Sequence, residues 1–413
     1  MTTLSRSVDC CIAGGGPAGI MAGLLLARAG VRVLVLEKHA DFLRDFRGDT
    51  VHPSTLEIMN ELGLYDKFLQ RPHTKARRIQ GRIGTLKLTV ADFSHLPTRA
   101  KFIAMMPQWE FLDFLSGEAR RYPNFELIMQ AEVTGLTSDG VRVTGLVART
   151  PEGIFTVGSD LVLGCDGRHS TVRKEAALAV VDLGAPMDVL WFRLSRKPGD
   201  PDEPIGSFGA GHIFIAIDRG DYWQCGFVIA KNTLDAVKAR GIDKIRAEIA
   251  EQSPLHADRV GEITSFDDMK LLTVGVDRLT TWHKPGLLLI GDAAHTMSPI
   301  GGVGINLAIQ DAVATANLLA APLRNRSLQS SDLAGVQTRR LRPTKIIQWI
   351  QVQIQRRIIS GVLGSSQQIA PPLAFKLLMR IPWLTRWPAR LIGLGYRPEH
   401  VAERVPVAVP YRA

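Results

Sequence analysis

Three glycines follow the first apolar run of the chain, and their spacing is typical of a turn that binds phosphate. Val8–Ala13 is mostly apolar, and Gly14, Gly16 and Gly19 come directly after it as Gly-x-Gly-x-x-Gly. The first glycine allows a tight turn, the second lets the backbone approach a pyrophosphate, and the third lets helix and strand pack closely. The N–H groups at the start of the following helix would then bind the phosphate oxygens.

An acidic residue lies where the ribose of a nucleotide would need a hydrogen-bond acceptor. Glu37 follows the second apolar run, Val31–Leu36, and stands 18 residues after Gly19. At this distance a carboxylate can accept hydrogen bonds from the hydroxyls of an adenosine ribose. The order strand, glycine turn, helix, strand and acid therefore predicts a nucleotide site. The alternative is a glycine-rich turn that binds no ligand.

Two more turns of the chain carry acidic or glycine residues just after apolar strands. Leu161–Gly164 is predicted to be a short buried strand, and Asp166 follows it. Gly286–Ile290 is predicted to be another, and Asp292 follows it before the glycine-rich run Pro299–Asn306. Because parallel strands end at one edge of a sheet, we expect these groups to meet the first glycine turn around one extended ligand.

The composition of the whole chain is ordinary for a folded protein. The 413 residues are 46% hydrophobic and 22% charged, and this length favours two or three domains. The four cysteines form no CxxC pair and no His/Cys cluster, so we expect no metal site and reduced thiols in a cytoplasmic protein. No signal sequence precedes the first strand, and no uninterrupted apolar run reaches the ~20 residues that span a bilayer.

The net charge of +10 is concentrated in the last fifth of the chain, where residues 331–413 hold 13 Lys or Arg and 3 Asp or Glu. Within it, Arg380–Arg390 alternates arginines with Trp383 and Trp387. Such a segment could lie peripherally on an anionic membrane. The alternative is a solvated face, with the two tryptophans packed over a cavity or against a helix. No motif for nucleic-acid binding is present, and the oligomeric state is open.

The three motifs, in this order, resemble those of the single-component flavoprotein monooxygenases of the para-hydroxybenzoate hydroxylase fold. The resemblance covers residues 8–320 and implies an α/β fold, in which a Rossmann-like FAD-binding domain carries an inserted β-sheet substrate domain and is followed by a C-terminal helical region. The expected boundaries are 1-75, 101-182 and 283-330 for the FAD-binding domain, 76-100 and 183-282 for the substrate domain, and 331-413 for the helical region.

The resemblance implies FAD as the cofactor and NADPH or NADH as a transient co-substrate. The glycine turn and the acid after it would hold the adenosine diphosphate end of FAD. The second glycine-rich run would lie against the isoalloxazine ring, with backbone N–H groups near its pyrimidine oxygen. The residues expected at the cofactor are Gly14, Gly16, Pro17, Ala18, Gly19, Glu37, Lys38, Arg47, Gln108, Asp166, Asp292, Pro299, Gly302, Val303, Gly304, Ile305 and Asn306.

The reaction that the resemblance implies is hydroxylation of an aromatic or other electron-rich small molecule by O2. NAD(P)H would reduce the flavin, O2 would form a C4a-hydroperoxide, and the distal oxygen would pass to the substrate. Because the protein mainly positions the substrate and excludes water, no catalytic base is predicted with certainty. The polar candidates that could meet the substrate are His52, His212, Tyr222 and Gln224.

Three other classes of flavoenzyme stay open as alternatives. One is a flavin-dependent oxidoreductase or dehydrogenase that does not use O2 productively. Another is a halogenase-like enzyme, although the Trp-x-Trp-x-Ile-Pro segment of that class is absent from the chain. The third is a membrane-associated enzyme that modifies quinones or isoprenoids, which the basic segment with its tryptophans suggests.

Overall fold

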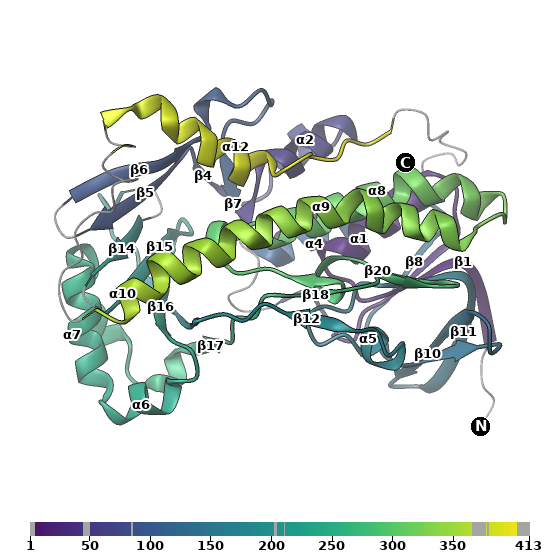
Figure 1. The fold of residues 1–413 in the computed structure, drawn as a ribbon, viewed down its shortest axis with the longest axis horizontal. Helices are drawn as coiled ribbons and strands as arrows, with labels where there is room; N and C mark the ends of the chain where they lie inside the picture. The colour runs from purple at the N-terminus through teal and green to yellow at the C-terminus, as the bar shows by residue number, and fades with distance from the viewer. Residues whose placement is uncertain are drawn as a thin grey trace.

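The structure is a computed structural model that describes residues 5–43, 50–83, 86–201, 205–209, 211–365, 377 and 380–402. Figure 1 shows a parallel sheet with its helices at one end of the molecule and a second sheet at the other. Two long helices, α8 and α9, run side by side along the molecule from the first sheet toward the second.

The parallel sheet is built outward from β1 (Ser5–Ala13). β1 pairs with β2 (Val33–Leu36) on one side and with β11 (Gly153–Gly164) on the other. β8 (Phe125–Ile128) continues the sheet beyond β2, and β20 (Leu287–Leu289) continues it beyond β11. These five strands are parallel, so their carboxyl ends lie at one edge. Antiparallel strands complete the sheet: β9 (Glu132–Ser138), β10 (Val143–Thr150) and β19 (His283–Lys284).

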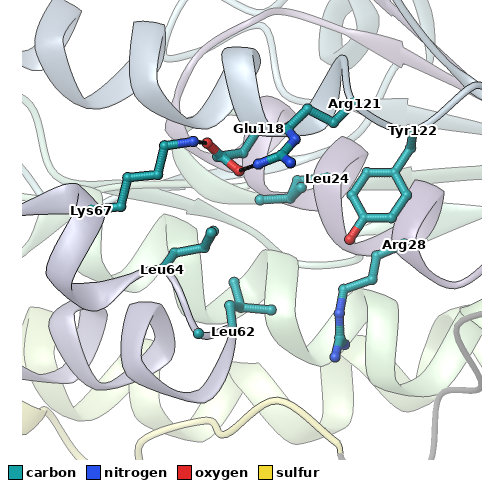
Figure 2. A pocket seen from close by; sticks show the side chains of 9 residues that line it. Leu24, Arg28, Leu62, Leu64, Lys67, Glu118, Arg121 and Tyr122 are labelled. Atoms are coloured by element: carbon teal, nitrogen blue, oxygen red, sulfur yellow. Dashed lines mark hydrogen bonds and ion pairs between the residues drawn. The ribbon is translucent and has the colours of Figure 1, made fainter. Parts of the chain in front are cut away.

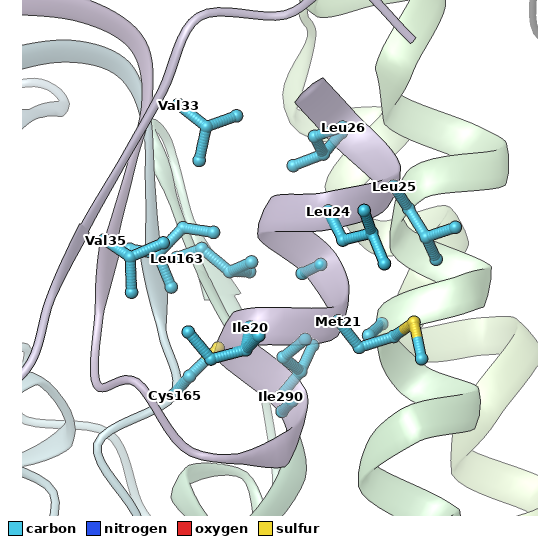
Figure 3. Packing of buried hydrophobic residues seen from close by; sticks show 14 of the residues in the cluster. Ile20, Met21, Leu24, Leu25, Leu26, Val33, Val35, Leu163, Cys165 and Ile290 are labelled. Atoms are coloured by element: carbon cyan, nitrogen blue, oxygen red, sulfur yellow. The ribbon is translucent and has the colours of Figure 1, made fainter. Parts of the chain in front are cut away.

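The helix that follows β1 is buried on nearly all sides. α1 (Pro17–Arg28) has ten buried residues and almost no polar side chains, as expected of a helix that packs on two sides. It lies between the apolar side chains of the parallel sheet and α8 (Gly304–Arg324), as Figure 3 shows. The segment Ile300–Arg324 is long and apolar enough to span a bilayer, but 78% of its apolar window is buried inside the fold, as in the core helix of a globular protein.

The second sheet has seven strands and joins two distant parts of the sequence. Its hairpin β5 (Arg78–Ile83) and β6 (Leu86–Asp92) is attached by parallel pairing of β5 with β14 (Ile205–Phe208). One face of the sheet packs against α6 (Leu234–Ala239) and α7 (Ile242–Gln252). The remaining strands are β13 (Met187–Ser195), β15 (Ile213–Asp218), β16 (Tyr222–Ala230) and β17 (Lys270–Leu272).

Short strands and helices connect the two large sheets. One small sheet consists of β3 (Thr50–Val51), β4 (Thr74–Ala76) and β7 (Ile103–Met105), and another of β12 (Val180–Asp182), β18 (Asp277–Leu279) and β21 (His295–Thr296). The shorter helices are α2 (Pro53–Glu61), α3 (Tyr65–Phe68), α4 (Gln108–Ala119) and α5 (Thr171–Glu175).

The C-terminal part is helical, as predicted. α9 (Ser330–Ile354) continues through one turn of π-helix (Gln355–Ile359) into α10 (Ser360–Leu363), and α12 (Arg386–Leu394) lies beside β6 and α2. The two tryptophans of the basic segment do not pack inward. Trp383 and Trp387 are 57% and 68% exposed, so the expectation that they pack over a cavity or against a helix is wrong.

Two other sequence-based element predictions were also wrong. Leu161–Gly164 is not a separate strand but the end of the 12-residue strand β11, which pairs along its whole length with β1 and β10. The sequence alone predicts a single helix over Asn232–Gln252, but the structure has two helices there, α6 and α7. They are separated at Gly241, whose φ of +81° is a conformation that favours glycine. The domain boundaries given above stay a prediction.

Candidate active site

The polar residues predicted at strand ends do come to one edge of the parallel sheet. Ala13, the last residue of β1, lies in register with Leu36 of β2 and with Gly164 of β11, and Gly164 lies in register with Leu289 of β20. The glycine turn, Glu37, Asp166 and Asp292 follow these four positions in the sequence. The register of the strands therefore brings together the strand ends that carry these motifs, as the sequence predicts.

The three glycines of the first turn have different surroundings. Gly14 has a φ of +98°, and a Cβ there would lie 2.5 Å from the carbonyl oxygen of Cys165. A Cβ at Gly19 would lie 2.0 Å from the carbonyl oxygen of Gly14. Gly16 has open space within 4 Å, and no side chain in the described part of the chain caps the start of α1 there. The open helix N-terminus at Gly16 is suited to a pyrophosphate, so the residues present fit FAD.

Glu37 is fixed by the glycine turn and is largely buried. Its Oε2 accepts a hydrogen bond of 2.8 Å from the N–H of Gly15, and its Oε1 accepts one of 3.1 Å from the N–H of His39. A carboxylate has about four acceptor positions, so ribose hydroxyls can still be bound. Lys38 is exposed, Gln108 is the half-buried first residue of α4, and Arg47 lies outside the described residues.

Asp166 caps the helix that follows it. Its carboxylate accepts hydrogen bonds from the hydroxyl of Ser170 at 2.5 Å and from the N–H of Val172 at 3.0 Å. Burial raises the pKa of Asp166, although these two hydrogen bonds act in the opposite direction. The side chain thus holds the start of α5 against the edge of the sheet. Any contact with a cofactor would be in addition to this local role.

The second glycine-rich turn is a short 3₁₀ turn that leads into α8. Gly301 and Gly302 have φ values of +78° and +62°, and a Cβ at Gly302 would lie 2.4 Å from the hydroxyl oxygen of Thr50. That hydroxyl donates a hydrogen bond of 2.9 Å to the carbonyl of Gly302. We call Pro299–Asn306 the flavin turn, because it is the segment expected at the isoalloxazine ring.

Asn306 ties the flavin turn to the segment before α2. Its Oδ1 accepts hydrogen bonds from the N–H of His52 at 2.9 Å and from the hydroxyl of Thr55 at 2.7 Å. Its Nδ2 donates to the carbonyls of Thr50 and Gly302, both at 3.3 Å. The side-chain amide is therefore fully used inside the protein. A ligand at this turn would therefore contact backbone groups and not the side chain of Asn306.

His52 is the one of the four polar candidates that lies beside the flavin turn. Its ring is fully buried, and burial lowers its pKa to about 4, so the ring is neutral at pH 7. Nδ1 lies 2.7 Å from the carbonyl oxygen of Ile392, which fixes the tautomer with the proton on Nδ1. Nε2 is buried without a hydrogen-bond partner in the described structure. A Cβ at Gly301 would lie 3.8 Å from Ile392, so α12 also borders the turn.

The other three candidates lie in the second sheet and do not form a cluster. His212 precedes β15, stacks on Phe227, and has a pKa that burial lowers despite the carboxylate of Glu248 at 3.8 Å. Tyr222 and Gln224 lie at the opposite end of the same strand pair, because Ile213 pairs with Val228 whereas Ile217 pairs with Gln224. Four residues of a strand span about 13 Å, which separates His212 from the other two.

Sequence reasoning missed a buried charge network behind the flavin turn. Asp311 is fully buried; its Oδ2 lies 2.6 Å from Nε2 of His295 and accepts from the N–H of Gly291 at 3.1 Å. Its Oδ1 accepts from Arg340 at 2.8 Å. Burial raises the pKa of Asp311, but the neighbouring charges and hydrogen bonds outweigh it and the pKa is lowered. The partners come from three separate segments of the sequence, so no local pattern predicts the network. The one sequence signal near it was the apolar strand that precedes Gly291.

One cavity of about 390 Å³ lies at the end of α1 away from the glycine turn. Figure 2 shows the side chains that line it. Arg28, from the last turn of the helix, lines it, together with Tyr122. Lys67 and Arg121 form ion pairs with Glu118 at the same place. About 16 Å of helix separates Arg28 from Pro17, so this cavity is not part of the candidate site.

Comparison with known proteins agrees with this geometry. A family model described as FAD binding domain matches residues 7–349. A 6-methylpretetramide 4-monooxygenase from Streptomyces rimosus is 34% identical over 378 residues, which are 91% of this chain and 89% of that protein. The structure of the anhydrotetracycline hydroxylase OxyS from Streptomyces rimosus has a TM-score of 0.71 and 25% identity, and the match covers 95% of this chain and 77% of that one.

A flavin-dependent brominase also shares the fold. Its TM-score is 0.74 at 17% identity, with 94% of this chain and 96% of that one covered. Identity this low shows the fold alone, whereas the monooxygenases share both fold and sequence. The halogenase-like alternative is therefore the weaker one. The glycine turn, the second turn and the matched relatives agree, and the chain belongs to the FAD-dependent aromatic monooxygenases of the para-hydroxybenzoate hydroxylase fold.

Proposed function

We propose that this enzyme hydroxylates a fused-ring phenol of the tetracycline type, with NADPH or NADH as the source of electrons. The observation that carries the substrate class is the 34% identity, over 91% of the chain, to a 6-methylpretetramide 4-monooxygenase. A flat aromatic substrate with electron-donating hydroxyl groups also suits an electrophilic oxygen donor. Bound FAD would supply the redox chemistry that activates O2.

The face of the second sheet that meets the flavin turn supports a flat, apolar substrate. Trp191 and Ile215 point to this face, and Ile300 of the flavin turn packs against the same cluster. Gly226 lies opposite Trp191, and a Cβ there would lie 3.0 Å from the indole ring, so the glycine lets the ring lie over the strand. The indole N–H of Trp191 is buried with no hydrogen-bond partner in the described structure. We assign it as a donor to a substrate oxygen.

The chain would hold FAD at its two glycine turns. The N-terminus of α1 would bind the pyrophosphate, and Glu37 the ribose hydroxyls. Backbone N–H groups of the flavin turn would stabilise negative charge on the reduced ring system. His52 is neutral and presents a bare Nε2, which can accept a hydrogen bond from the cofactor or the substrate but donates no proton at neutral pH.

The reaction is tested by coupled assays on the purified protein. The protein should be yellow and should oxidise NADPH or NADH faster when a fused-ring phenol is present than with a single-ring phenol. O2 consumption should match a product that is one oxygen atom heavier. A colourless protein that cannot be reconstituted with FAD would refute FAD binding. Electron transfer that yields only hydrogen peroxide with every phenol would refute the hydroxylation.

The cofactor placement is tested at Glu37. Glu37→Gln keeps the size of the side chain but removes the negative charge, so hydrogen bonds from ribose hydroxyls become weaker. A lost charge-assisted bond should lower FAD affinity about 10- to 100-fold, as measured by titrating the apoprotein with FAD. Lys38→Gln, at the exposed neighbour, is the control. Equal FAD affinity of the Glu37 variant and the control would remove the ribose role.

We also propose that the protein is cytoplasmic and that it makes peripheral contact with a membrane. The support for this contact is the exposure of Trp383 and Trp387 one helical turn apart, with Arg386 and Arg390 exposed beside them. Co-sedimentation with vesicles of anionic lipid should then fall when Arg386 and Arg390 are both replaced by Glu. If the native protein stays in the supernatant, this contact does not occur.

A further inference from the structure

Three glutamines of the last long helix bind the backbone that leads into the flavin turn. Gln348 and Gln351 belong to α9, and Gln355 begins the π-helical turn after it. Their spacing of three and four residues places all three side chains on one face of the helix. Each is at most 3% exposed. We call Gln348, Gln351 and Gln355 the glutamine ladder.

Gln351 makes the central contacts of the ladder. Its Oε1 accepts a hydrogen bond of 3.1 Å from the N–H of Ser298, and its Nε2 donates to the carbonyls of Ser298 and Ile300, both at 2.9 Å. These bonds resemble the pairing of a neighbouring strand, but one side-chain amide makes them. The backbone on either side of Pro299 is thus held from outside the turn.

The two outer glutamines make further hydrogen bonds on either side of Gln351. Gln348 donates from Nε2 to the carbonyls of Thr296 and Asp277, at 3.1 and 2.7 Å, while its Oε1 accepts from Arg278 at 3.0 Å. Gln355 donates to the hydroxyl of Ser298 at 2.8 Å. The backbone carbonyls that these amides contact lie in β18, in the segment just before the flavin turn and, for Ile300, in the turn itself.

The π-helical turn is a second, independent sign that this helix end is adapted to the site. A π-turn adds one residue to the helical repeat, and such turns are frequent at functional sites. Here Ile354, Ile358 and Ile359 all pack into the apolar cluster that contains Ile300. In a regular α-helix, adjacent residues such as Ile358 and Ile359 point about 100° apart. Here both side chains lie in the cluster that contains Ile300 of the flavin turn.

We propose that the glutamine ladder positions the flavin turn, so that α9 forms part of the active site although it makes no expected contact with FAD. This inference rests on the proposed function in one respect, namely that the flavin turn binds the isoalloxazine ring of FAD. The amide is suited to this task, because it donates and accepts at once and carries no charge that changes with pH. The geometry of the turn would then be the same across the pH range in which the enzyme works.

The ladder is tested first in the apoprotein, where no cofactor is needed. Gln351→Glu keeps the shape of the side chain, but a carboxylate cannot donate to the carbonyls of Ser298 and Ile300. We expect amide hydrogen exchange over residues 296–302 to become about tenfold faster or more. The effect should be smaller at pH 6 than at pH 8, because the introduced carboxyl group regains one donor when it is protonated.

A matched control stands two residues further on in the same helix. Gln353 is half-buried, and its amide makes no hydrogen bond in the described structure. Gln353→Glu introduces the same charge and should leave exchange over 296–302 unchanged. Equal exchange in both variants and the native protein would overturn the inference. If Gln351→Glu does not fold, Gln355→Met serves instead, because it removes only the bond to Ser298.

The loaded enzyme gives the second measurement. Gln351→Glu should still bind FAD through the first glycine turn, but a displaced flavin turn should change the visible spectrum and the midpoint potential of the bound flavin. More hydrogen peroxide should also form per NADPH oxidised. An unchanged potential and unchanged peroxide yield in a folded variant would refute the role toward the flavin. Failure of the native protein to bind FAD would instead refute the proposed function, and the exchange result would stand by itself.

Discussion

At the scale of single residues, the candidate site is held by side chains that bond to backbone. The side-chain amide of Asn306 makes hydrogen bonds only within the protein, to Thr50, His52, Thr55 and Gly302. The carboxylate of Glu37 accepts hydrogen bonds from the N–H groups of Gly15 and His39. A polar side chain at a binding site is easily read as a ligand contact. Here such side chains first shape the loops, and the loops then present their N–H groups to a ligand.

Gly302 should be intolerant of any side chain. Ala at this position would adopt a φ of +62° and place its Cβ 2.4 Å from the hydroxyl of Thr50. Strain and the lost bond from Thr50 to the carbonyl should together lower the free energy of unfolding by on the order of 2 kcal/mol. FAD affinity should fall as well. For stability, Gly304→Ala is the control, because its Cβ would meet only Met297 at an ordinary 3.8 Å.

His52 should make the protein less stable in mild acid. Its pKa is about 4 in the fold because of burial, whereas the unfolded chain has a pKa near 6.5. Between these values the unfolded state binds a proton that the folded state does not. Stability should therefore fall as the pH is lowered from about 6.5 to about 4, by about 3 kcal/mol over the full window.

Thermal unfolding across this pH range checks the effect. His52→Asn places an amide nitrogen near the position of Nδ1, so it can still donate to the carbonyl of Ile392 but cannot be protonated. Its stability should therefore change less between pH 6.5 and 4. His95 is exposed, and His95→Asn should follow the native curve. A His52 variant with the same pH profile as the native protein would contradict this assignment.

At the scale of elements, short sequence signals predicted strands and turns better than helix ends. The glycine turn and the strands before and after α1 were predicted from local patterns, because turn glycines and short apolar runs act within a few positions. The break between α6 and α7 at Gly241 was missed, because a glycine inside a helical pattern does not by itself end a helix. The glutamine ladder was missed as well. An amide has no sequence signature, and its partners lie about 50 residues away.

The contact between α8 and α9 includes a buried ion pair. Arg340 and Asp311 are both fully buried, and Arg340 also lies 3.5 Å from Glu399. Arg340→Met would leave two carboxylates without this partner, so the free energy of unfolding should fall by about 3–5 kcal/mol. The neighbouring Arg339 is 46% exposed, and its loss leaves Glu399 the contact with Arg340, so Arg339→Met should cost less than Arg340→Met. Equal losses in urea titrations would show that burial of the pair does not matter.

At the scale of the whole molecule, the site depends on pairings that no local pattern could reveal. Thr50 bonds to Gly302, His52 to Ile392, and β5 pairs with β14 across more than 120 residues. The family resemblance, which rests on the order of the motifs, predicted the fold, because the fold is shared by the relatives. It could not predict which side chains form hydrogen bonds that hold the turns in place, since these bonds depend on the packing of this particular chain.

The two glycine turns give FAD two separate points of contact, so fragments of the cofactor should protect separate parts of the protein. ADP resembles only the end of FAD that the first turn would bind. Hydrogen exchange in the apoprotein should therefore slow over residues 14–20 with ADP. With FAD it should slow over residues 14–20 and also over residues 298–306. The segment 50–55 should follow the second turn, because Asn306 bonds to both.

The stability of the whole molecule should respond in the same way. FAD at 100 times its dissociation constant should stabilise the fold by about 2.7 kcal/mol, and ADP at an equal multiple by the same amount, because this gain depends only on saturation. The exchange pattern, not the melting temperature, therefore distinguishes the two ligands. If FAD protects residues 14–20 but leaves 298–306 as exposed to exchange as ADP does, the isoalloxazine ring does not lie at the flavin turn. Protection of 298–306 by ADP alone would contradict the assignment of two ends, since the adenosine half does not reach that turn.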